Sequence, residues 1–182
     1  MPRVPSALPE IRRDVRSPNH TERRGTDRPD MIVLHYTGME SAGSAITRLC
    51  DPSAEVSAHY VVDLSGETFA LVDEERRAWH AGRSAWGRVS DVNSYSIGIE
   101  IVNPGHQLGY PPFPDPQMRS VEVLVGAAMA RWGIPGERVV GHSCVSPGRK
   151  IDPGEKFDWR RLALQGLGVW LDPFETEGKD EG

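Results

Sequence analysis

Residues 139–154 read VVGHSCVSPGRKIDPG, and this stretch organises the rest of the chain. It begins with an apolar pair that is typical of a short strand, continues through Gly-His, and ends in a loop that closes on Asp-Pro-Gly. The loop carries an imidazole at His142, a cation at Lys150 and a carboxylate at Asp152. Loops held by a rigid strand are frequent positions for functional side chains. We therefore expect part of a functional site here, with its remaining groups supplied by other segments.

The composition indicates one globular domain. The chain has 182 residues, of which 38% are hydrophobic and five are tryptophan, so it has enough apolar side chains for a core. This content excludes a wholly disordered chain. The net charge of −5 is moderate. It gives no reason to expect a nucleic acid or an anionic membrane as a partner.

The first residues lack the 7–15-residue apolar core of a Sec signal peptide, and no run approaches 18 apolar residues. Only two cysteines occur, Cys50 and Cys144, and without an export signal we expect both to be reduced thiols. We therefore expect a cytoplasmic protein with no membrane-spanning segment.

The hydrophobic pattern predicts an α/β fold in which a central mixed sheet is flanked by helices. In residues 96–102, the three isoleucines alternate with Gly98, Glu100 and Val102, as expected of a strand with two different faces. Apolar residues at spacings of three and four predict one long helix over 117–132. The other expected strands are 31–36, 57–63, 68–72 and 139–140, and the other expected helices are 43–50 and 158–167.

Three segments make up the predicted domain organisation. Residues 1–28 are rich in Pro, Arg and Asp, and we interpret them as an irregular N-terminal arm. Residues 29–170 form the predicted folded domain, and residues 171–182 form an acidic C-terminal tail.

Two of the six histidines, His35 and His142, follow short strand-like runs, which places them where a sheet opens to a cleft. A single histidine in such a position is more often structural than a ligand. With Asp152, however, they form two imidazoles and one carboxylate, the set that a catalytic zinc site uses beside an open position. No HExxH helix is present. From the residues alone, a zinc hydrolase is a plausible interpretation.

Several motifs in order carry a resemblance to the type-2 N-acetylmuramoyl-L-alanine amidases, which share a fold with the peptidoglycan recognition proteins. The resemblance covers roughly residues 29–165. By this resemblance the zinc ligands are His35, His142 and Asp152, while Glu100 and Lys150 match the family's glutamate and lysine. The motifs are MIVLHYT, SAHYVV, AWHAG, NSYSIGIEIVNP and VGHSCVSPGRKIDPG, followed by FDW.

The residue types suit the implied roles. Glu100 lies on a strand face beside Gly98, where a missing side chain leaves room for substrate or water, and it can act as general base and then acid. Lys150 can donate charge-assisted hydrogen bonds to an oxyanion. The alternatives are a solvated glutamate and an ordinary surface lysine. Arg149 either holds the loop or meets a substrate carboxylate.

Other residues are candidates for substrate binding or mark a departure from the family. Trp79 and His80 are predicted to form the wall of the cleft, where an aromatic face packs on a sugar ring or lactyl group. Asn93 either hydrogen-bonds the peptide stem or caps a turn. Many relatives have Asp where this chain has Cys144, which we expect to be a thiol that does not ligate zinc.

The resemblance implies hydrolysis of the amide between the lactyl group of N-acetylmuramic acid, or its 1,6-anhydro form, and L-Ala. The expected cofactor is zinc, the expected partners are peptidoglycan fragments, and neither nucleic acid nor membrane is expected. The missing export signal favours soluble anhydro-muropeptides and a role in cell-wall recycling. The alternatives are a wall-lytic amidase that acts on intact peptidoglycan and a non-catalytic muropeptide-binding module.

Overall fold

The computed structural model describes residues 10–171. Its centre is a six-stranded mixed sheet of order β1-β5-β4-β7-β3-β8, in which β4, β7, β3 and β8 are parallel and β5 is antiparallel to β4. A two-stranded antiparallel sheet of β2 and β6 lies beside it. The strands are β1 Ile11–Arg12, β2 His20–Glu22, β3 Met31–Tyr36, β4 Tyr60–Val62, β5 Thr68–Ala70, β6 Arg76–Ala78, β7 Ser96–Ile101 and β8 Val139–Gly141.

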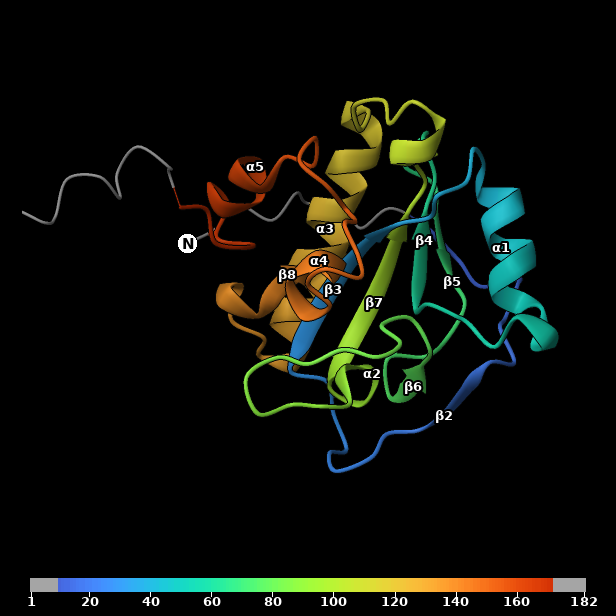
Figure 1. Ribbon diagram of the computed structural model, residues 1–182, viewed down its shortest axis with the longest axis vertical. Coiled ribbons are helices and arrows are strands. Elements are labelled where there is room, and N and C mark those ends of the chain that lie inside the picture. The colour runs from blue at the N-terminus through green and yellow to red at the C-terminus, as the bar shows by residue number, and fades with distance from the viewer. Residues whose placement is uncertain (1–9, 172–182) are drawn as a thin grey trace, which may run out of the picture.

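Helices lie on both sides of this sheet (Figure 1). In that view α3 lies behind the central strands, while α1 lies at the side of β4 and β5. The α-helices are α1 Ala42–Cys50, α2 Val92–Tyr95, α3 Asp115–Trp132, α4 His142–Val145 and α5 Trp159–Ala163. Three short 3-10 helices are formed by Pro52–Ala54, His106–Leu108 and Gly136–Arg138.

The face of the sheet that packs on α3 is apolar. Ile97, Ile99 and Ile101 of β7 are fully buried there, as their alternation in the sequence predicts. Residues of α3 at helical spacing complete this layer, among them Met118 and Val125. This face is the main core of the protein, and it leaves the opposite face of the sheet for the site.

The strand register places the polar residues on that opposite face. His35 of β3 pairs with Glu100 of β7, and Val33 pairs with Gly98. Since paired residues of neighbouring strands point to the same side, His35 and Glu100 share one face. Separate apolar clusters, one of them around α1, cover the rest of this face.

The α/β fold with its mixed sheet and flanking helices confirms the predicted fold class. The predicted β4–β5 hairpin is present, and its turn uses Gly66 at φ 89°, a conformation that favours glycine. The long helix begins at Asp115, two residues before its predicted start. Asp158 caps α5 as expected, because its side chain accepts the N–H of Arg161.

Residues 10–28 differ from the irregular arm that their composition predicts. They contribute β1, which pairs with β5, and β2, which pairs with β6. Arg23 is buried and donates to the carbonyl oxygens of Glu74 at 2.6 Å and Ser94 at 2.7 Å. Strands of two or three residues are too short to show an alternating pattern, so composition alone missed them.

The two ends of the chain bear on the remaining domain predictions. Residues 1–9 of the predicted arm and 172–182 of the predicted acidic tail lie outside the described residues. Within residues 10–171, no helix combines the length and apolar character needed to span a membrane.

Candidate metal centre and cleft

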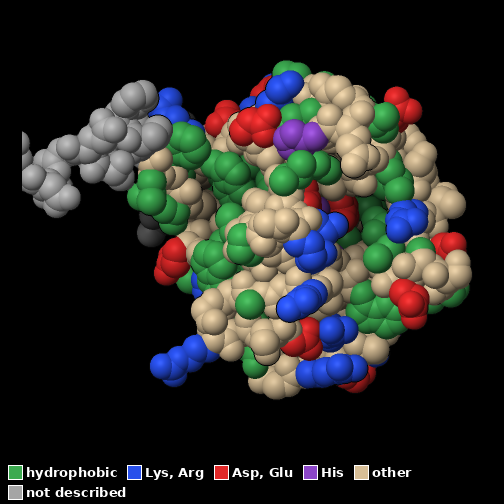
Figure 2. Space-filling view, viewed as in Figure 1, with side chains coloured by type: hydrophobic (Ala, Val, Ile, Leu, Met, Phe, Trp, Pro, Cys, Tyr) green, Lys and Arg blue, Asp and Glu red, His purple; other side chains and the backbone are tan. Residues whose placement is uncertain are grey.

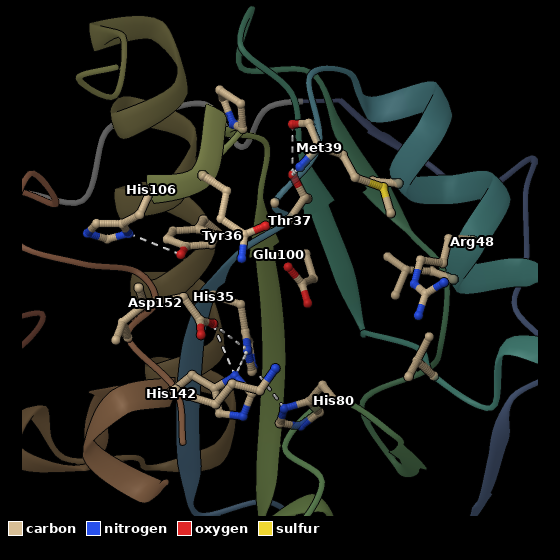
Figure 3. A pocket seen from close by; sticks show the side chains of 18 of the residues that line it. His35, Tyr36, Thr37, Met39, Arg48, His80, Glu100, His106, His142 and Asp152 are labelled. Atoms are coloured by element: carbon tan, nitrogen blue, oxygen red, sulfur yellow. Dashed lines mark hydrogen bonds and ion pairs between the residues drawn. The ribbon is translucent and has the colours of Figure 1, made fainter. Parts of the chain in front are cut away.

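Three side chains that are distant in the sequence converge at the ends of adjoining strands. His35 lies near the end of β3, His142 begins α4 directly after β8, and Asp152 lies in the following loop. One ligand atom from each lies within 4.8 Å of the others, and all three residues are buried. The two Nδ1 atoms are 2.9 Å apart, and Asp152 Oδ2 is 3.2 Å from His35 Nδ1 and 3.0 Å from His142 Nδ1 (Figure 3).

The hydrogen bonds of His142 show which of its nitrogens is free. His142 Nε2 lies 3.0 Å from the carbonyl oxygen of Ala81, which only accepts, so Nε2–H is the donor. In the neutral ring Nδ1 is therefore an acceptor, and it faces Asp152 Oδ2, another acceptor. Two acceptors this close repel each other unless a proton or a metal cation lies between them.

The protonation of the other two groups also suits a cation. Burial lowers the pKa of His35 to about 4, so its ring is neutral near pH 7. Burial raises the pKa of Asp152, whereas a proton shared with His142 or His35, or a metal cation in its place, lowers it. Two imidazoles and a carboxylate are donors that suit zinc. The residues present therefore fit the ion that the family resemblance implies.

Backbone contacts hold the loop that carries His142 and Asp152. Ser143 N–H donates to the carbonyl oxygen of Asp152 at 2.9 Å, which ties the two ends of the loop together. Arg149 donates to the carbonyl oxygens of Ala81 and Arg83, each at 2.8 Å. Of the two roles considered for Arg149, the structure favours loop support, since its guanidinium already joins two loops.

The three groups line one side of a cavity of about 530 Å³. Figure 2, in the same view as Figure 1, shows a hollow on this face with basic side chains along its lower edge. A volume of this size accommodates a small ligand. The lining includes His35, Tyr36, Trp79, His80, Glu100, His142, Lys150 and Asp152 together with Arg48 of α1 and His106.

Glu100 lies in this cavity with one carboxylate oxygen, Oε2, buried and without a hydrogen-bond partner among the described residues. Burial, with the negative charge of Asp152, raises the pKa of Glu100 well above 4.5, and Lys150 opposes this shift. Lys150 also lines the cavity and has no ion-pair partner in the described part of the chain. The cleft therefore presents the carboxyl group of Glu100 and the amino group of Lys150 beside the three converging donors.

The space beside Glu100 is not used as the sequence suggests. A Cβ added to Gly98 would lie 2.3 Å from Cγ of His80, so the imidazole of His80, and not substrate or water, fills the room that this glycine leaves. His80 is buried, and its ring nitrogens lie near His35 and Ser96. Trp79 is half-buried and lines the cavity, as the predicted wall position requires.

Asn93 is not among the described residues that line the cavity. Its Oδ1 accepts the backbone N–H groups of His80 at 3.0 Å and Ala81 at 2.8 Å. Of the two roles predicted for Asn93, the structure favours support of a turn. Cys144 is exposed, and the metal-binding group found among residues 10–171 does not include it.

The sequence did not single out Arg48 or His106 as cavity residues. Arg48 lies in the last turn of α1, one helical turn after Ala45, which also lines the cavity. Residues three apart on a helix lie on the same face, so Arg48 could have been predicted if Ala45 had been known to face the cleft. His106 begins the short 3-10 helix His106–Leu108 within a proline-containing segment, where spacing carries no such information.

This α/β fold carries a buried His-His-Asp group, which could hold a metal ion, at the strand ends beside a cleft. The chain belongs to the N-acetylmuramoyl-L-alanine amidase family, because its residues 25–155 match the model of that family. It is similar to N-acetylmuramoyl-L-alanine amidase AmiD of Escherichia coli, with 38% identity over 154 residues, covering 78% of this chain and 55% of AmiD.

A second relative is covered more completely. The chain is 32% identical over 167 residues to 1,6-anhydro-N-acetylmuramyl-L-alanine amidase AmpD of Haemophilus influenzae, covering 82% of this chain and 89% of AmpD. The fold of this chain is similar to that of E. coli AmiD in complex with the substrate anhydro-N-acetylmuramic acid-L-Ala-D-γ-Glu-L-Lys. That likeness has a TM-score of 0.76 and 33% identity, and it covers 87% of this chain and 70% of AmiD.

Proposed function

We propose that this protein is a zinc-dependent N-acetylmuramoyl-L-alanine amidase that hydrolyses the amide between a muramic acid lactyl group and L-Ala. The observation that carries the proposal is the convergence of His35, His142 and Asp152 beside Glu100 in one cavity. Zn²⁺ held by these three residues would supply Lewis acidity, which lowers the pKa of water toward about 7 and polarises a carbonyl group.

Glu100 is proposed to move the proton. Glu100 lines the cleft, and its Oε2 has no hydrogen-bond partner among residues 10–171, so the carboxyl group can accept a proton from the attacking water and later give it to the departing amine of L-Ala. Burial and the negative charge of Asp152 raise the pKa of Glu100, which favours holding the proton between the two steps. One carboxyl group thus serves in both halves of the reaction.

Lys150 is proposed to stabilise the negative charge that develops on the lactyl carbonyl oxygen. Its ammonium group lies in the same cavity as Glu100, and its charge is not consumed by a carboxylate among the described residues. Trp79 is proposed to contact the sugar or lactyl group, since its ring lines the cavity. His80 and Asn93 are proposed to support the site from behind.

We propose soluble 1,6-anhydro-muropeptides as substrates and cell-wall recycling as the role. The names of AmpD of H. influenzae and of the AmiD complex both specify the anhydro form of the sugar, which supports this choice. A cytoplasmic location and a folded domain at 29–170 remain predictions of the sequence. Cell fractionation tests the location.

Mass spectrometry of the products tests the proposed function. Zinc-loaded protein is incubated separately with soluble anhydro-muropeptide and with intact sacculi. The expected result is faster release from the soluble substrate of a peptide with a free L-Ala amine, with a mass increase of one water across the products. Equal or faster cleavage of sacculi would favour a wall-lytic enzyme, and zinc binding without cleavage of either would favour a binding module.

A further inference from the structure

A row of hydrogen bonds runs from the metal centre, past the wall of the cleft, to the start of β7. It joins His35 of β3 to His80, then to Ser96 at the start of β7, and then to the carbonyl oxygen of Val92 in α2 (Figure 3 shows the His35–His80 step). The three distances are 3.0, 3.1 and 2.6 Å. All four residues are buried, so water does not compete for these groups.

The far end of the row fixes the direction of every donor. The carbonyl oxygen of Val92 can only accept a hydrogen bond, so the Ser96 hydroxyl donates its single proton to it. Ser96 Oγ must then accept from His80, which places a proton on His80 Nε2. In a neutral His80 ring, Nδ1 is then the acceptor nitrogen.

The direction carries through to the metal centre. Because His80 Nδ1 accepts, its partner His35 Nε2 must donate. A neutral His35 with a proton on Nε2 has an unprotonated Nδ1, and this is the nitrogen that faces His142 and Asp152. With both rings neutral, the opposite tautomer of either histidine would break a contact: His80 would face Ser96 Oγ without a proton, or His35 Nε2 would face His80 Nδ1 without one.

We propose that His80 is a positioning residue, which holds His35 in the tautomer and orientation that present Nδ1 to a metal ion. The position of His80 is itself fixed, because a side chain at Gly98 would overlap its ring and Asn93 Oδ1 accepts its backbone N–H. Outer partners of this kind typically change metal affinity by roughly 10- to 100-fold. The inference rests on the proposed zinc site and adds a role for a residue that does not touch the metal.

Zinc affinity, measured by competition with a chromophoric chelator, is the first test. His80→Leu, which keeps the bulk and removes the acceptor, is expected to weaken zinc binding roughly 10- to 100-fold. His80→Asn, which returns an acceptor near the position of Nδ1, is expected to recover most of this loss. Gly98→Ala keeps the imidazole but displaces it, and it is expected to weaken zinc binding as His80→Leu does.

His59→Leu is the matched control. His59 is fully buried, and its ring centroid lies 5.8 Å from that of His80, but it is not part of the row. It is expected to lower stability while leaving zinc affinity within a few-fold of the wild type. Equal zinc affinity in wild type and His80→Leu, or an equal loss in His59→Leu, would overturn the proposal.

Nitrogen-15 NMR of the zinc-loaded wild-type protein decides the question even where a variant fails to fold. The proposal requires protons on Nε2 of both His35 and His80, and a proton on His80 Nδ1 would overturn it. These readouts do not depend on catalysis. A protein that binds zinc and cleaves no amide would contradict the proposed function, while the affinities and tautomers would still decide the role of His80.

Discussion

Four buried histidines lie on the same face of the sheet, and they divide into two pairs. In His59 and His80, both ring nitrogens have partners that leave no lone pair free: His59 accepts the N–H of Gly98 at 2.9 Å and lies 3.0 Å from the carbonyl oxygen of Arg76. In His35 and His142, one nitrogen is anchored in the same way, but Nδ1 faces other acceptors.

The comparison shows what separates a candidate ligand from a structural histidine in this protein. Burial does not, because all four are nearly inaccessible to solvent. The pKa does not either, since burial lowers that of His35 to about 4 and that of His59 to about 3. The deciding feature is a lone pair that only a cation can satisfy. The following predictions test this distinction, from the largest expected effect to the smallest.

Removal of the metal is expected to have the largest effect. Treatment with a strong chelator should abolish amidase activity, by more than about 1,000-fold, because several kcal/mol of transition-state stabilisation are lost. Activity is measured by release of peptide from anhydro-muropeptide. Stoichiometric Zn²⁺ should restore it, and Mg²⁺ should not, because Mg²⁺ prefers oxygen ligands. Full activity after verified removal of zinc would contradict the proposed mechanism.

Replacement of Glu100 is expected to separate catalysis from metal binding. Glu100→Ala should lower kcat by roughly 100- to 10,000-fold, the usual contribution of general acid–base catalysis, while bound zinc stays unchanged. The paired measurements are kcat and zinc content of the same preparation. A control is Glu67→Ala, since Glu67 is an exposed residue of the hairpin turn and is not among the residues that line the cavity. Loss of zinc in Glu100→Ala would show that Glu100 holds the metal instead.

His59, one of the two histidines without a free lone pair, is expected to make folding stability depend on pH below 6.5. His59 has a pKa of about 3 when folded, because of its burial, and about 6.5 when unfolded, so the unfolded chain binds the proton more readily. The stability that His59 contributes is therefore complete above pH 6.5 and is lost as the pH falls toward 3. At pH 5 the loss from this residue is about 2 kcal/mol.

Urea unfolding of metal-free protein at pH 7 and pH 5 measures this loss. The metal-free state removes any contribution from zinc release. His59→Gln has no group that titrates in this range at that position, so its free energy of unfolding should fall by about 2 kcal/mol less than that of the wild type. Equal decreases in the two proteins would show that His59 is already protonated in the fold.

Arg48 is expected to give the smallest effect. It lies on the α1 side of the cavity, opposite the metal centre, and has no ion-pair partner in the described part of the chain. Arg48→Gln should raise KM by up to about fivefold for a substrate with a stem-peptide carboxylate, since exposed ion pairs contribute about 1 kcal/mol or less. Steady-state kinetics measure this, and kcat should be unchanged. A decrease in kcat with constant KM would instead implicate Arg48 in the chemical step.

Much of this arrangement could be predicted from residue patterns, because these features depend on residues that are close together in the sequence. The alternation in residues 96–102 predicted which face Glu100 occupies, and the strand-end positions of His35 and His142 predicted that they would meet. The fold class followed from the same periodicities.

The parts that could not be predicted depend on contacts between distant segments. Nothing in AWHAG indicates that His80 points behind His35, because that direction is set by Gly98, eighteen positions later. The acceptor role of Asn93 and the carbonyl partners of Arg149 are likewise tertiary contacts. The short strands β1 and β2 exist only because β5 and β6 offer them edges to pair with.

Zinc content of purified protein, measured by inductively coupled plasma mass spectrometry, tests the distinction between the two pairs most directly. The account predicts one zinc per chain in the wild type and in His59→Leu. It predicts almost none in His35→Ala or His142→Ala, each shown by circular dichroism to be folded. A full complement of zinc in folded His142→Ala would contradict it.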